Sequence, residues 1–445
     1  MSSSLQETVQ AAVRSVGDRG EVEISGSIRT DMEVNVFKGA VAEYVKSTAR
    51  AWSVRALSGA CIGTAYTEKN DSGALAETIA AARRNASFMD EDPGNGLCGN
   101  RGEAIFTVGD AGAVLSEADC RGLALGLDRR CQDLDPRIVN VPKAVCGCGE
   151  YRSVVATGGG LYRELTQRFA YLFAYLVASE GGKTESGMHV SCVRSFSALD
   201  VEGVARAAVQ KTLDLLGGRE PESGNYPCIL AREAASGLIG AFLGNLDAEA
   251  MQKGMSKLAG KQGQKLGSAE FTLIDDPAAP GFGKAPFDDE GVDSSRLVLF
   301  DQGVFFQPLY TIYSARREGK QSNGRGFRPS AKSPLRASAI NAFIPEGDAS
   351  VETMIARMDR GIAVSELQGL HAGLNPVSGD FSCSAKGYAI RGGKKDGALR
   401  NFTVSGNFYD LIQRIQLRGN DRRLDTQSHF SSPSLDVESL AVSAR

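Results

Sequence analysis

Segments of β-like sequence, interrupted by glycine, constrain the fold of this chain more than any other feature. Between residues 21 and 67 glycines and charged turn residues separate runs rich in β-branched and aromatic side chains, at 21–28, 32–37, 40–48, 50–57 and 59–67. Glycine adopts positive φ without a steric penalty, so the 52 glycines of the chain predict many tight turns between short strands. The pattern predicts antiparallel sheet in this region.

Helical periodicity flanks these strands and returns later in the chain. The predicted helices span 4–17, 71–89, 116–135, 199–218 and 408–421. Asp71 or Ser72 is expected to cap the second helix and a serine the third, because short polar side chains accept hydrogen bonds from free helix N–H groups. The signatures at 301–303 and 392–397 predict β-hairpins.

These elements predict three domains. Residues 1–90 form an N-terminal α+β domain, residues 110–218 a middle α+β domain with the same helix–sheet–helix order, and residues 226–445 a larger β-rich C-terminal domain. The expected fold class is therefore α+β, with helix–antiparallel sheet–helix units followed by a larger β-rich C-terminal domain.

Composition narrows the function classes. The 50 basic and 53 acidic residues nearly balance, and no long basic run suggests nucleic-acid binding. No apolar stretch is long enough to span a membrane, and the N-terminal sequence lacks the apolar core of a signal peptide, so we expect a cytoplasmic protein. The nine cysteines follow no disulfide or zinc-site spacing, and the three histidines are few for a metal protein.

Two charged segments are candidates for binding. The acidic doublets at 273–277 and 287–291 are interpreted as solvated turns or caps, with a metal loop as the alternative. The segment 310–330 places arginines among glycines and serines, which is typical of a mobile surface loop. Its length makes it a candidate lid, and its guanidinium groups suit a carboxylate or phosphate.

The stretch GLHAGLNPVSGDFSCSAKGYAI, residues 369–390, predicts a structured turn that leads into a strand. Pro376 presets φ, Gly379 permits positive φ, and Asn375 and Asp380 can bond neighbouring backbone groups. The same stretch holds His371 and Cys383, so a catalytic dyad is an alternative interpretation. Twelve residues of separation say little about the distance between the two side chains.

Several motifs in the same order resemble the TldD/PmbA family, once called modulators of DNA gyrase. ELQGLHAGLNPVSGDFSCSAKGYAI, VSGNFYDLIQRI, PFDDEGV and YSARREG are similar to the family's C-terminal domain, and ARAWSVRALSGACIGTAYTEKN to its N-terminal domain. The resemblance implies a cytosolic metalloprotease of two subunits that acts on unfolded or small peptides. In the TldD branch, a helix carries His-Glu-x-x-x-His, which implies zinc and a glutamate base.

This chain departs from that motif. Gly240 and Asn245 stand where the resemblance places the histidines, and Ala241 where it places the glutamate. None of them can replace an imidazole as a zinc ligand. The resemblance therefore points to the PmbA (TldE) branch: no cofactor in this chain, no catalytic residue of its own, and zinc expected in a TldD-like partner.

We expect the turn to contact the peptide or the partner, through His371, Asn375, Ser378, Gly379, Asp380 and Phe381. An extended peptide can add to a sheet edge through main-chain hydrogen bonds. Two alternatives stay open: an independently active peptidase using the His371/Asp380/Cys383 region, and a peptide-binding protein without hydrolysis. A homodimer is an alternative to the heterodimer.

Overall fold

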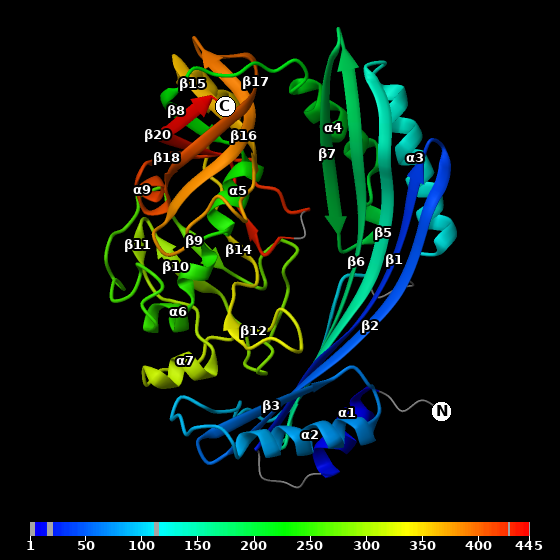
Figure 1. Cartoon of the computed structure of the whole chain (residues 1–445), viewed down its shortest axis with the longest axis vertical. Helices are drawn as coiled ribbons and strands as arrows, with labels where there is room; N and C mark the ends of the chain where they lie inside the picture. The colour runs from blue at the N-terminus through cyan, green and yellow to red at the C-terminus, as the bar shows by residue number, and fades with distance from the viewer. Residues whose placement is uncertain (1–4, 16–20, 111–114, 426–427, 445) are drawn as a thin grey trace.

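The computed structural model describes residues 5–15, 21–110, 115–425 and 428–444, arranged as two halves (Figure 1). A long, bent sheet with its helices forms the N-terminal half, and the C-terminal half stands beside it. The helices are α1 (Leu5–Ser15), α2 (Ser72–Ala86), α3 (Glu117–Leu134), α4 (Val201–Asp214), α5 (Arg232–Gly240), α6 (Ala248–Gln252), α7 (Ile312–Arg317), α8 (Val351–Ala356) and α9 (Phe408–Gln413). Short 3₁₀ segments lie at Phe196–Ala198 and Leu243–Leu246. No helix in these described ranges is long and apolar enough to cross a membrane.

The N-terminal half is built on one seven-stranded sheet in the order β3-β2-β1-β5-β6-β4, with β7 paired to β6. Its strands are β1 (Val22–Phe37), β2 (Ala40–Ser58), β3 (Cys61–Thr67), β4 (Gly102–Val108), β5 (Ile138–Thr157), β6 (Leu161–Glu180) and β7 (Lys183–Val193). Because β1 pairs along its length with both β2 and β5, strands expected in residues 1–90 and in residues 110–218 share this sheet.

Two strands are longer than the sequence predicts. β1 joins the segments expected at 21–28 and 32–37, and β2 joins those expected at 40–48 and 50–57. The polar residues between the expected segments pair across the ladder, as Thr30 does with Thr48, rather than turning the chain. Polar residues on a partly solvated sheet therefore looked like a turn in the sequence.

Helices cover the two ends of this sheet separately (Figure 1). α1 and α2 pack on Ile24, Trp52 and Val54 at one end, whereas α3 and α4 pack on Met32, Val34 and other buried residues at the far end. The Trp52 ring lies so close over Gly26 that a Cβ there would meet it at 2.3 Å. Asp71 caps α2 and Ser116 caps α3, as predicted.

The C-terminal half contains two larger sheets around one hydrophobic core. A six-stranded sheet has the order β17-β16-β15-β8-β20-β18, and a five-stranded sheet has the order β11-β10-β9-β14-β19. The strands are β8 (Gly224–Leu230), β9 (Leu273–Asp275), β10 (Leu297–Asp301), β11 (Val304–Phe305), β14 (Ala342–Phe343), β15 (Arg360–Gln368), β16 (Asp380–Arg391), β17 (Lys394–Asn407), β18 (Ile415–Arg418), β19 (Phe430–Ser431) and β20 (Leu435–Ala444). A separate pair joins β12 (Gly326–Phe327) to β13 (Arg336–Ala337).

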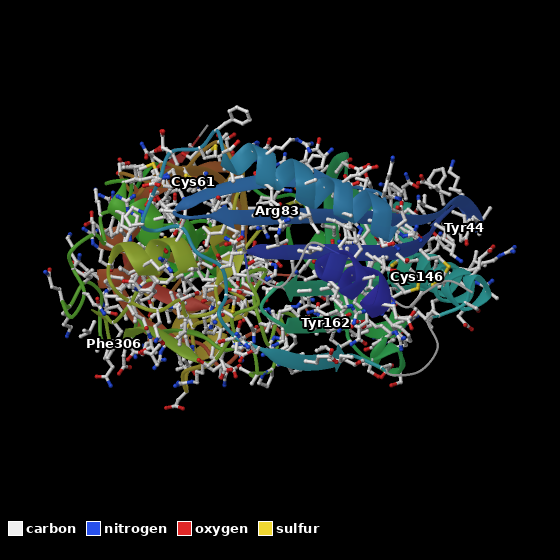
Figure 2. All side chains as sticks on the ribbon, turned by 90° about the horizontal axis from the view of Figure 1, so that it is seen from below. Tyr44, Cys61, Arg83, Cys146, Tyr162 and Phe306 are labelled. Carbon is white, nitrogen blue, oxygen red and sulfur yellow. The ribbon has the colours of Figure 1, made fainter. Side chains whose placement is uncertain are left out.

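The expected α+β class is confirmed, and so are both hairpins. The turn between β10 and β11 uses Gln302 and Gly303 at φ 46° and 83°, and the turn between β16 and β17 uses Gly392 and Gly393. The helix predicted over 408–421 was wrong beyond Gln413, because the chain from Ile415 pairs with β20 instead. Seen from below, Tyr44 on β2 and Phe306 after β11 mark opposite sides of the molecule (Figure 2).

Candidate functional site

Charged side chains from both halves meet in an ionic junction made of Glu23, Arg55, Glu290 and Arg328. Arg55 of β2 binds Glu23 of β1 through two hydrogen bonds of 2.8 and 2.6 Å, and its Nη1 lies 2.9 Å from Glu290 Oε1 in the C-terminal half. Arg328 Nη2 lies 3.7 Å from Glu23 Oε1, and its Nη1 donates to Ser25. The junction therefore binds the two halves through buried, opposite charges.

Burial sets the protonation behaviour of the carboxylates at this junction. It raises the pKa of Asp289 to about 6 and also raises the pKa of Glu290, although Arg55 opposes the second shift. Burial and the neighbouring Glu290 hold the pKa of Asp288 well above its ordinary value. Burial disfavours the charge on Arg55, but Glu23 and Glu290 outweigh that effect and raise the pKa of Arg55.

Two sequence expectations about these segments need correction. Asp288 does cap a turn, accepting from the N–H groups of Glu290 and Gly326, but the turn is buried, not solvated. The surface loop expected at 310–330 was wrong for its second half, because Arg325 is fully buried against Asp275 with an Nε–Oδ2 distance of 2.6 Å, whereas residues 316–321 are exposed. Asp288 and Arg325 each have a partner in a distant part of the chain. Local composition therefore predicted exposed side chains where the fold buries them against these partners.

A smaller cavity of about 520 Å³ lies where α5 ends. Most of its lining residues are small or polar, with two rings and one leucine among them: Ser236, Gly237, Gly240, Leu243, Gly244, Ala337, Ser338, Ala339, Ser428, His429 and Phe430. A Cβ on Gly244 would meet no atom within 4 Å, whereas one on Gly240 would lie 3.3 Å from the Phe430 ring. The cavity therefore exists because the helix end carries glycines.

The residues at this helix end do not fit a zinc ion. Gly240 has no side chain, Ala241 caps the end of α5, and the chain then continues as a 3₁₀ segment rather than as α-helix. Asn245 is buried, and its Nδ2 has no hydrogen-bond partner among the described residues. Among the residues that the structure describes, no three His, Cys, Asp or Glu side chains are grouped so that they could hold a metal ion.

His429 is the imidazole of this site, and the sequence analysis did not single it out. Its Nδ1 lies 3.0 Å from the carbonyl oxygen of Ile340, which accepts only if Nδ1 carries the proton. The backbone of His429 is fixed as well, since its carbonyl accepts from the N–H of Ala342. With Nδ1 protonated, a neutral ring keeps Nε2 as an acceptor at the cavity wall.

A larger cavity of about 690 Å³ adjoins the smaller one, and both are lined by Ala337, Ser338, Ala339 and His429. It lies between the two halves, because β5 and β6 contribute Tyr151 and Phe169 while the C-terminal half contributes Phe282 and Phe327. Arg194, Lys284, Arg328 and Arg336 also line it. The two cavities together offer an elongated space with aromatic and cationic walls.

The turn at 369–383 uses its polar groups on itself. Asn375 Oδ1 accepts from the N–H groups of Val377 and Ser378, and Asp380 accepts from Ser378 Oγ at 2.7 Å and from Asn407 Nδ2 at 2.8 Å. These hydrogen bonds to Ser378 and Asn407 hold the pKa of Asp380 below its ordinary value. The polar pattern that marks the turn in the sequence is thus largely a folding signal.

The remaining turn residues differ in exposure. His371 is exposed, Phe381 is buried in the core, and Gly379 holds φ at 85° with the Tyr409 ring 2.7 Å from where a Cβ would be. Leu370, next to His371, lies 3.0 Å from where a Cβ on Gly237 would be. One end of the turn therefore packs against Gly237, a residue that lines the smaller cavity.

No hydrogen bond within the described residues links His371, Asp380 and Cys383 as a catalytic set. Cys383 is buried, and burial raises the pKa of its thiol. A nucleophilic cysteine needs a lowered pKa and access to substrate. The geometry therefore gives no support to a cysteine–histidine dyad in this turn.

Comparisons with known proteins agree with this architecture. Residues 112–216 match the PmbA/TldA metallopeptidase central domain, and residues 223–444 match the PmbA/TldA metallopeptidase C-terminal domain. The metalloprotease PmbA of Escherichia coli O157:H7 is 25% identical, over 99% of this chain and 96% of the relative. A metalloprotease TldD homologue of Buchnera aphidicola from Acyrthosiphon pisum is 24% identical, over 66% of this chain and 63% of its own length.

Solved structures share the fold over almost the whole chain. A proposed modulator of a DNA gyrase from Thermotoga maritima superposes with a TM-score of 0.85 and 27% identity, covering 95% of this chain and 96% of its own. TldE from Thermococcus kodakarensis superposes with a TM-score of 0.86 and 23% identity, covering 99% and 100%. The matched domains extend over well over half of the sequence, so the chain belongs to the PmbA/TldA metallopeptidase family, as a protein of the PmbA/TldE type.

Proposed function

We propose that this chain is the zinc-free subunit of a cytoplasmic metalloprotease complex and supports peptide binding for a TldD-like partner. The partner supplies the zinc and the glutamate base, and the complex cleaves unfolded or small peptides. Neither nucleic acid nor membrane takes part. The cavities of this chain form part of the space that receives the peptide.

The end of α5 carries this proposal. Gly240, Ala241 and Asn245 provide no imidazole and no carboxylate, yet the space beside them stays open and lined by His429. The space beside Gly240 and Gly244 is open and partly polar, so it can receive part of an extended peptide. This supports a role in substrate binding rather than in catalysis.

Metal content and peptidase activity test the proposal. The purified chain is assayed alone and mixed with a TldD-like protein, with zinc measured by mass spectrometry and cleavage followed on a fluorescent unfolded peptide. We expect a chain without stoichiometric zinc that is inert alone and increases cleavage by the partner. Zinc bound at one ion per chain, or cleavage by this chain alone, contradicts the proposal.

Variants of the turn test whether it contacts the peptide or the partner. Alanine at His371, Asn375 and Asp380 is expected to weaken pairing with the partner or peptide cleavage. If both persist at the level of the unchanged chain, the turn is not a contact. Cleavage by the isolated chain that thiol reagents abolish would instead establish the peptidase alternative.

A further inference from the structure

The larger cavity holds cations that the described part of the chain does not neutralise. Arg194, Lys284 and Arg336 line it, and within that part none of them has a carboxylate at ion-pair distance. Other charges in the wall are answered: Arg29 binds Asp31 at 2.7 Å, and Arg328 stands beside Asp289 and Glu23. The wall of this cavity therefore carries positive charge that no ion pair balances: Arg194 and Lys284 lie close enough to affect each other, and Arg336 adds a third cation.

Arg194 shows the imbalance most clearly. Its guanidinium donates to oxygens that carry no formal charge, namely the carbonyls of Arg168 and Phe282 and the side-chain amide of Gln167. Its buried Nε has no hydrogen-bond partner among the described residues. The guanidinium carbon lies 4.0 Å from the centre of the Phe282 ring. Burial lowers the pKa of Arg194 to about 10, as expected for a cation without a counter-charge.

Lys284 has a similar environment. Its Nζ donates to the carbonyls of Ala278 and Ala279, not to a carboxylate. Burial lowers the pKa of Lys284; Asp276 partly opposes the shift, and the positive charge of Arg194 adds to it. Two cations that repel each other at a cavity wall are stabilised when an anion binds between them.

The cavity also has the walls and the length for a peptide. Phe169 and Phe282 face each other edge to face, with ring centres 6.2 Å apart. Ala337, Ser338 and Ala339 run along both cavities and end near His429. An extended chain that entered at the cationic wall could therefore continue past His429 towards Gly240.

We propose that Arg194, Lys284 and Arg336 bind a carboxylate of an extended peptide, whose chain then runs past His429 into the smaller cavity. Arg336 suits this ligand because the N–H groups of a guanidinium match the two oxygens of a carboxylate. The Nη groups of Arg194 already donate to neutral oxygens, so Arg194 contributes its positive charge and its unpartnered Nε. The inference rests on the proposed function and adds a preference to it: a peptide with an anionic end or an acidic side chain binds better than a neutral one.

Three peptides that differ in one charge test the preference. They are a fluorescein-labelled unstructured peptide with a free C-terminal carboxylate, the same peptide as its C-terminal amide, and the amide with glutamate as its last residue. Binding to the full chain, with and without a TldD-like partner, is measured by anisotropy. We expect the free acid or the glutamate peptide to bind about 10-fold more tightly than the neutral amide, the size of one charge-assisted hydrogen bond.

Variants locate the effect. Arg194→Gln and Arg336→Gln are expected to reduce the preference for the anionic peptides to about 2-fold or less, because each removes one cation that has no ion-pair partner in the cavity wall. Arg336 is exposed and has no ion pair among the described residues, so its variant keeps the test valid if Arg194→Gln weakens folding. Arg391→Gln, which removes an exposed cation paired with Asp396 at 3.3 Å outside the cavity, is the matched control and should keep the full preference.

The outcomes separate this inference from the proposed function. Equal affinity for all three peptides, or a preference that both cavity variants retain, overturns the inference and leaves the supporting role intact. No binding of any peptide, with or without the partner, overturns the inference as well. If the partner's cleavage also does not depend on this chain, the proposed function fails separately.

Discussion

Charges gather at two neighbouring places between the halves of the molecule, and their surroundings differ. In the ionic junction, Arg55 has Glu23 on one side and Glu290 on the other. In the larger cavity, Arg194 and Lys284 donate hydrogen bonds only to neutral oxygens among the described residues. Buried cations with carboxylate partners therefore stabilise the fold, whereas cations without such partners indicate a binding site for an anionic ligand.

Removing a compensated charge should have the largest effect. Arg55→Met leaves Glu23 and Glu290 buried without their shared cation, so we expect the free energy of unfolding to fall by about 3–5 kcal/mol. Urea denaturation followed by circular dichroism measures it. Arg336→Gln is the control, with an expected change within about 0.5 kcal/mol. A loss below 1 kcal/mol for Arg55→Met would mean that the junction does not bind the halves.

Asp289 lies next to Glu290 of the ionic junction and also lines the larger cavity, and its charge makes stability depend on pH. Its folded pKa of about 6 lies above the ordinary value of 3.8, so its contribution to stability is present below about pH 4 and is lost as the pH rises through about 6. Asp289→Asn cannot ionise, so it does not lose this stability. The difference in free energy of unfolding between the variant and the unchanged chain should therefore shift by about 2–3 kcal/mol in favour of the variant when the pH is raised from about 4 to about 8. Urea unfolding at both values checks this. An equal difference at the two pH values would contradict it.

Removing an uncompensated charge should have the smallest effect on stability and can have the opposite sign to that of Arg55→Met. Lys284→Gln removes a cation that Arg194 repels and keeps a donor for a carbonyl oxygen. We expect the free energy of unfolding to stay constant or rise by up to about 1 kcal/mol. Differential scanning fluorimetry followed by urea titration detects it. A clear loss would show that Lys284 belongs to the structural charges instead.

The sequence predicts those features of the structure that depend on residues close together in the chain. The β10–β11 hairpin and the Asp71 cap were predictable, because each depends on residues within one turn of the chain. The resemblance to the TldD/PmbA family, and with it the PmbA/TldE type, came from motifs that are contiguous in sequence.

The remaining features depend on pairs that only the fold brings together. Arg325 lies against Asp275, and Arg328 beside Glu23, so the second half of an arginine-rich stretch that suggested a surface loop is buried by distant partners. His429 was missed for the same reason: its importance comes from Gly240 and Gly244 across the cavity, not from its neighbours in sequence.

The most direct test of the supporting role fills the smaller cavity without disturbing the fold. A Cβ at Gly244 meets no atom within 4 Å, and neither does a Cβ at Gly122 on α3, so Gly244→Leu and Gly122→Leu form a matched pair inside and outside the cavity. The measurement is the rate at which each chain, mixed with a TldD-like partner, cleaves an unfolded peptide. The account predicts that Gly244→Leu lowers this rate about 10-fold or more at unchanged pairing, since misplacing a bound peptide costs at least that much, while Gly122→Leu does not. Equal rates for the two variants and the unchanged chain would contradict it.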